Sequence, residues 1–177
     1  EYLRMRKAVQ FNRSQVFLLN PYSTKASDIA TLELVYKPGT DEVVISAICL
    51  AGLELGAVAG DIEGLRRMTG FGSASAAATA CGVELVEIQA VAHALAEGKE
   101  VTFFAGELAT RSREREAVAA AICNLNKLFG IRDKGQLAVL ARYPNSVGAA
   151  KFGLSPHNNP KLVSELKAIW GQYPDMP

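Results

Sequence analysis

Short apolar runs alternate with longer segments of helical periodicity along this chain, and this alternation restricts its fold more than any other feature. Residues 15–20 read QVFLLN, a continuous apolar run ending at Asn-Pro, which is typical of a buried parallel strand. Residues 32–36 (LELVY), 101–105 (VTFFA) and 137–141 (LAVLA) predict three further strands. Strands that alternate with helices favour a mainly parallel sheet with helices on both faces. We therefore expect an α/β, Rossmann-like fold.

The opening of the chain, residues 2–7, is expected to be helical, and several further helical segments lie between the second and third predicted strands. Thr40 is expected to cap a helix whose first turn carries Asp41 and Glu42, since carboxylates favour the positive end of a helix dipole. Helical spacing of apolar residues predicts further helices over 62–68 and 84–96. Residues 73–80 (SASAAATA) are compatible both with a linker and with a tightly packed helix, so both readings stay open.

The second half of the chain repeats the alternation. Ser112 is expected to cap a long helix that ends at Gly130, and Asn159 with Pro160 to open the last helix. The buried stripe of the long helix is expected to be Val118, Ile122, Leu125 and Phe129. The break at Glu97-Gly98-Lys99 suggests lobes over 1–97 and 98–177, or one continuous domain.

Composition indicates a packed chain with no electrostatic preference for a polyanion. Apolar residues make up 49% of the 177 residues, and the formal charge is only +1, so nothing favours nucleic acid or an anionic membrane as a partner. The apolar stretch 43–59 is too short and too interrupted to cross a bilayer. Three scattered cysteines, Cys49, Cys81 and Cys123, are expected to be buried reduced thiols.

Polar residues and glycines gather where the predicted strands end. In a parallel sheet, ligands bind beyond the carboxyl ends of the strands, so we expect the loops at 20–24, 38–41, 106–107 and 142–149 to form one crevice. Ordinary turn chemistry explains the same residues, and neither GxGxxG nor GxxxxGK[ST] is present. No group near His93 or His157 can be inferred to act as an orienting carboxylate, so no catalytic residue is assigned.

These loops resemble those of the molybdopterin oxidoreductase family, which includes formate dehydrogenases and nitrate reductases. The resemblance is carried by residues 16–48 (VFLLNPYSTKASDIATLELVYKPGTDEVVISAI), 81–106 (CGVELVEIQAVAHALAEGKEVTFFAG) and 145–156 (NSVGAAKFGLSP). Trp170-Gly171 followed by Pro174 also fits. The motifs occur in collinear order over most of the chain. The resemblance implies a fold of the formate dehydrogenase/DMSO reductase domain type.

In molybdenum-containing members of this family, the same loops hold the guanine dinucleotide part of the pterin cofactor. Carried over by position, the resemblance implies cofactor-binding roles for five residues: Asn20, Thr24, Asp41, Asn145 and Gly148. Asn20 stands where the family has an acid, and Tyr22 where it has an arginine. The first change removes a carboxylate that could accept hydrogen bonds from ribose hydroxyls, and the second removes a guanidinium that could bind phosphate through two hydrogen bonds.

Within the family, the opening YLRMRKAV and the short last section look most like the C-terminal part of the large peripheral iron–sulfur subunit of NADH:quinone oxidoreductase, respiratory complex I. This resemblance implies a scaffold that supports electron transfer, without catalytic residue, metal ligand or cofactor of its own. The iron–sulfur clusters would lie in the parent protein outside this chain. The parent would be an oxidoreductase, and this chain is expected not to be catalytic on its own.

The same resemblance implies other subunits of a membrane-bound respiratory complex as partners. It places the chain on the cytoplasmic side, peripheral to the inner face of the cell membrane, without membrane insertion and without nucleic acid. Two alternatives remain. One is a fragment of an oxidoreductase that binds molybdopterin guanine dinucleotide, similar to formate dehydrogenase. The other is a stand-alone nucleotide-binding module that shares only the fold.

Overall fold

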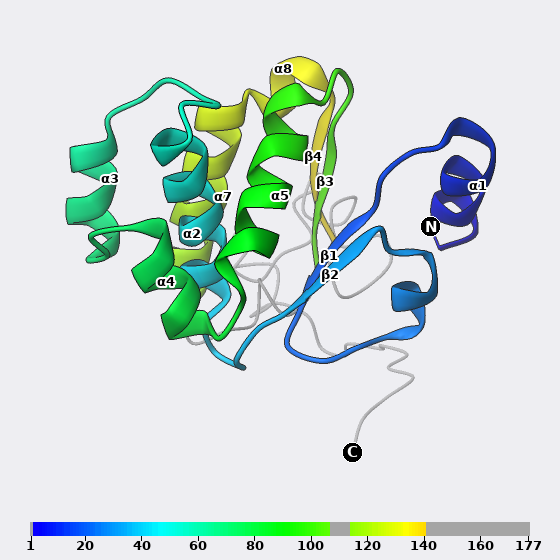
Figure 1. Ribbon diagram of the computed structural model, residues 1–177. Helices are drawn as coiled ribbons and strands as arrows, with labels where there is room; N and C mark the ends of the chain where they lie inside the picture. Colours follow the sequence, from blue (N-terminus) through cyan, green and yellow to red (C-terminus); the bar gives the residue numbers. More distant parts are fainter. Residues whose placement is uncertain (1, 107–113, 141–177) are drawn as a thin grey trace, which may run out of the picture. The chain divides into compact units, whose positions relative to one another are not determined.

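The computed structural model describes residues 2–106 and 114–140, and these have an α/β fold as predicted (Figure 1). The elements in chain order are α1 (Tyr2–Asn12), β1 (Phe17–Asn20), the 3₁₀ helix η1 (Lys25–Ile29), β2 (Leu32–Val35), α2 (Asp41–Glu54), α3 (Ile62–Thr69), α4 (Ala74–Cys81), α5 (Leu85–Glu97), β3 (Thr102–Ala105), α7 (Arg115–Phe129), α8 (Ile131–Lys134) and β4 (Gln136–Val139). The described residues up to Val139 belong to one compact unit. The predicted cap at Ser112, the loop 142–149 and the last helix lie outside the described residues.

The four described strands are parallel, but they form two separate pairs. β1 pairs with β2 from Phe17–Leu32 to Asn20–Val35, and β3 pairs with β4 over four residues each. The prediction of parallel strands is confirmed, and in the part of the chain that the structure describes these strands lie in two small sheets rather than in one. Each strand pairs with the strand next to it in the sequence, and no backbone hydrogen bonds link the pair β1–β2 to the pair β3–β4.

Helix α2 forms the centre of the hydrophobic core. Residues 43–52 are all buried, because this helix is apolar on every side and packs against α3, α4, α5 and α7 (Figure 1). The core also contains Leu34 of β2 and the buried stripe of α7, which lies where the sequence predicts it. One core cluster therefore includes residues on both sides of the suggested boundary at 97/98, and the two-lobe division stays a prediction.

The segment 73–80 is a helix rather than a linker. Ser73 caps α4, and its hydroxyl accepts a hydrogen bond from the backbone N–H of Ala76 at 3.2 Å. α4 ends at Gly82, whose φ of +77° is left-handed, and α7 ends at Gly130 with φ +60°, as predicted. Lys134 caps the C-terminal end of α5, because its Nζ donates hydrogen bonds at 3.0 and 3.1 Å to two carbonyl oxygens in the last turn of that helix.

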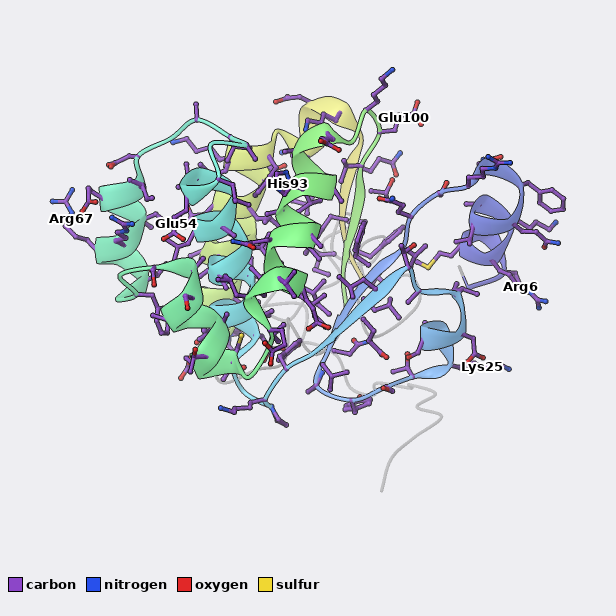
Figure 2. All side chains as sticks on the ribbon, viewed as in Figure 1. Arg6, Lys25, Glu54, Arg67, His93 and Glu100 are labelled. Carbon is purple, nitrogen blue, oxygen red and sulfur yellow. The ribbon has the colours of Figure 1, made fainter. Side chains whose placement is uncertain are left out.

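Glu54, labelled in Figure 2, joins three helices through one carboxylate. It is the last residue of α2, and its Oε1 accepts a hydrogen bond at 3.1 Å from the backbone N–H of Ala74, the first residue of α4. The same oxygen lies 3.4 Å from Nη2 of Arg66 on α3. The carboxylate thus satisfies a free N–H at the start of α4 and neutralises a cation of α3.

The cysteines differ in exposure. Cys49 and Cys81 are buried, as expected, and burial raises the pKa of the Cys49 thiol to about 12. Cys123 on α7 is exposed, so the expectation of a buried thiol is wrong there. All three thiols are free.

Within the described residues, no single helix is long and apolar enough to cross a membrane. Only the run Ile62–Cys81 combined with α5 passes by length and composition, and that pair is bent by 117°.

Candidate functional site at the ends of β1 and β2

Tyr36 connects the two strand ends where the sequence predicts a ligand. It follows β2 directly, and its backbone N–H donates to the carbonyl of Asn20, the last residue of β1, at 3.2 Å. Its hydroxyl donates to Oδ1 of Asp41, the first residue of α2, at 2.7 Å. Burial raises the pKa of Tyr36 far above its ordinary value, and the hydrogen bond and charge of Asp41 raise it further. The phenol therefore stays protonated and bonded to Asp41.

Thr24 is held within its own turn. It caps η1, its hydroxyl accepts from the backbone N–H of Ala26 at 3.2 Å, and its own N–H donates to Oγ of Ser27 at 3.0 Å. Ser27 in turn donates to Glu33 of β2 at 2.6 Å, and Ser23 donates to the other oxygen of the same carboxylate at 3.1 Å. These bonds fasten the connection between β1 and β2 onto β2 itself.

The loop between β2 and α2 is fixed at one end and open at the other. The backbone N–H of Lys37 donates to the carbonyl of Cys81 at 2.8 Å, which ties the loop to the end of α4. The Thr40 hydroxyl donates to the carbonyl of Lys37 at 2.6 Å, so Thr40 precedes the helix as predicted but does not cap it through its side chain. Gly39 has φ +83°, and a Cβ added there would meet no atom within 4 Å.

Negative charge gathers at the start of α2. Asp41 and Glu42 occupy its first turn, where they favour the helix dipole, as predicted. Burial raises the pKa of the Glu42 carboxyl, and the charges of Glu114, next to the start of α7, and of Asp41 add to this rise. Two helices thus begin near one another with carboxylates around them. A phosphate brought to this place would meet repulsion from these carboxylates as well as attraction from the free N–H groups.

Three of the five predicted cofactor-binding residues lie in the described part of the chain. Tyr36 brings Asn20 and Asp41 to the same edge, whereas Thr24 lies in the turn that is bonded to Glu33. Asn145 and Gly148 lie outside the described residues. Gly106 follows β3, which belongs to the other strand pair.

The sequence reasoning missed Tyr36, which it treated only as the end of a strand. A buried tyrosine needs a partner for its hydroxyl, and the acid five residues later supplies one. The spacing of Tyr36 and Asp41 is therefore the sequence signal from which this residue could have been predicted as part of the site.

A groove of about 410 Å³ lies at the opposite ends of these strands, where Phe17 and Leu32 face Ala90 and His93 of α5. His93, labelled in Figure 2, is exposed. No group of three or more His, Cys, Asp or Glu residues in the described ranges is arranged to hold a metal ion.

No protein-family model matches the chain, and no curated protein matches it at a significant level.

Proposed function

We propose that this chain is a scaffold domain of molybdopterin-oxidoreductase type within a subunit of a respiratory NADH:quinone oxidoreductase. In this proposal it contacts neighbouring subunits on the cytoplasmic side of the membrane and carries no electrons itself. The collinear family motifs support this assignment, as do short parallel strands paired across helical connections. The finer fold that we propose is the Rossmann-like domain of formate dehydrogenases, with the iron–sulfur clusters located elsewhere in the parent protein.

The observation that carries the proposal is that the strand-end edge is occupied by bonds within the chain. Asp41 accepts from Tyr36, Thr24 is bonded within its own turn, and the start of α2 already has two carboxylates. A dinucleotide would have to break these bonds and bring its phosphates beside Asp41 and Glu42. Such an edge suits a retained framework better than a cofactor site.

A thermal melt with guanosine diphosphate tests the absence of dinucleotide binding. A ligand of the folded state at about 100 times its Kd adds about 2.7 kcal/mol, which raises the midpoint of a chain this size by roughly 5–10 °C. We expect no rise at millimolar nucleotide. A rise that is abolished by Asp41→Ala would contradict the scaffold proposal and support nucleotide binding.

Purification from the source organism tests the parent complex directly. The chain, tagged in its natural protein, should elute from solubilised membranes together with NADH:quinone reductase activity. Elution without this activity, under conditions in which the activity survives in the extract, would refute the assignment to this complex.

The alternative function is binding of molybdopterin guanine dinucleotide, and two features of the same edge favour it. The backbone at Gly39 is open to a ligand, and the Asn20 side chain makes no hydrogen bond to any described residue. If this cofactor binds, these groups would hold its guanosine part, and the pterin would supply the redox chemistry when loaded. The fit is incomplete, because Asp41 and Thr24 are bonded internally. A stabilising shift with guanine nucleotide that requires Asn20 would favour this function.

A further inference from the structure

Helix α1 presents a basic face on which two large apolar side chains are exposed. The face consists of Leu3, Arg6, Lys7, Gln10 and Phe11, which the helical period brings to one side. Leu3 is 69% exposed and Phe11 72%, which places both among the most exposed large apolar side chains of the described residues, with Val86 at 69% and Met68 at 68%. Leucine and phenylalanine each gain free energy by burial, so their exposure together on one helix marks an interaction site.

The charge around this face has one sign. The stretch from Tyr2 to Ser27 contains five basic residues and no acidic one, and Asp28 is the first carboxylate after it. Arg6 and Lys7 are exposed and make no ion pair with any carboxylate in residues 2–106 or 114–140. Lys25 on η1, which contacts α1, adds a further exposed cation (Figure 2). A partner for this face must therefore be acidic.

The arrangement favours a protein over a lipid surface. Lys7 stands between Leu3 and Phe11 in the same stripe, so the exposed side has no continuous apolar sector that could enter a bilayer. The more apolar side of the helix, with Ala8 and Val9, is half-buried, and α1 contacts η1 of the same chain. Leu3 and Phe11, separated by Lys7, fit a protein groove that has an apolar recess for each of them and acidic residues along its edges.

We propose that the basic face of α1 docks into an acidic groove of a partner protein, with Leu3 and Phe11 as anchors and Arg6 and Lys7 paired to carboxylates. This inference is independent of the function proposed above, since it depends only on the exposed side chains of α1.

Photo-crosslinking in the source cells tests the proposal without a prior choice of partner. Benzoylphenylalanine replaces Phe11, and the adduct is identified by mass spectrometry after irradiation. We expect a single protein, crosslinked within a segment rich in Asp and Glu. Arg6→Glu together with Lys7→Glu should lower the adduct yield about fivefold or more, because like charges then face the groove. Both side chains are exposed, so a circular dichroism melt should show unchanged folding.

The matched control lies on α3, where Arg67 is exposed beside Met68, which is 68% exposed. Arg67→Glu should leave the Phe11-site adduct unchanged, and benzoylphenylalanine at Met68 should not yield the same protein. Adducts with phospholipid or nucleic acid, scattered adducts no stronger than those at Met68, or a yield unaffected by the charge reversal would each overturn the inference. A specific acidic partner that is not a subunit of NADH:quinone oxidoreductase would support it and count against the proposed function.

Discussion

Replacing Gly52 with alanine tests how closely α2 packs on α7. A Cβ at this position would lie 2.6 Å from Cζ and 3.2 Å from Cε1 of Phe129, and 3.2 Å from Cγ2 of Val58. Ordinary van der Waals contact begins at 3.4 Å, so the ring would have to move by about 0.8 Å. Phe129 is only 2% exposed and lies within the core cluster, where close packing leaves little room for such a shift.

Two opposing effects decide the sign of the change. Alanine in place of glycine inside a helix stabilises by about 0.5–1 kcal/mol. Overpacking a dense core costs about 1–3 kcal/mol. We therefore expect Gly52→Ala to lower the free energy of unfolding by roughly 1–2 kcal/mol, measured by urea denaturation followed by circular dichroism.

Two further variants separate the packing effect from a general effect of glycine replacement. Gly72 has no left-handed φ and no atom within 4 Å of an added Cβ, so Gly72→Ala should not destabilise and should gain at most about 1 kcal/mol. Phe129→Leu should remove the clash, and the double variant with Gly52→Ala should lose less stability than the two single variants together. A Gly52→Ala chain at least as stable as the wild type would refute the packing argument.

Three other changes address the hydrogen bonds and thiols. Glu54→Ala should cost about 1–2 kcal/mol in urea denaturation, because α4 loses the carboxylate at its start; an unchanged midpoint would show the bond to be dispensable. The raised pKa of Tyr36 predicts that stability is retained below pH 10 and falls above it, since only the unfolded phenol ionises, by up to about 1.4 kcal/mol per pH unit. Tyr36→Phe should show a flatter profile between pH 9 and 11, and equal slopes would contradict this. At pH 8, Ellman's reagent should react rapidly with Cys123 alone, slowly with Cys49 and Cys81, and Cys123→Ser should abolish the rapid phase.

Local sequence signals predicted most of the individual elements. Val118, Ile122, Leu125 and Phe129 are spaced four, three and four apart, and this spacing identifies the buried side of α7 without further information. Pro-Gly-Thr-Asp marks the start of α2, because a tight turn and an acidic first turn are both properties of neighbouring residues. Such features depend on contacts within a few positions of the chain.

Features that depend on distant contacts or on fine geometry were not predicted. The division of the strands into two pairs depends on which four-residue strands meet in space, which strand composition does not determine. Cys123 was assigned to the core by residue type, although it is turned by about 100° from Ile122 on the helix and so leaves the stripe. The bond between Tyr36 and Asp41 depends on the path of the intervening loop. The order of the predicted strands therefore located the candidate site, but the sequence did not predict the hydrogen bonds within it.

The burial of α2 on every side has a consequence for how the polypeptide is made. Its partner α7 ends at Phe129, some 75 residues after Glu54, so a ribosome adding about 5–20 residues per second needs roughly 4–15 s to deliver it. During that interval the side of α2 that packs against α7 in the folded protein stays uncovered. Premature termination before Arg115 would leave this apolar side uncovered permanently, and the released product would be a target for chaperones and proteases.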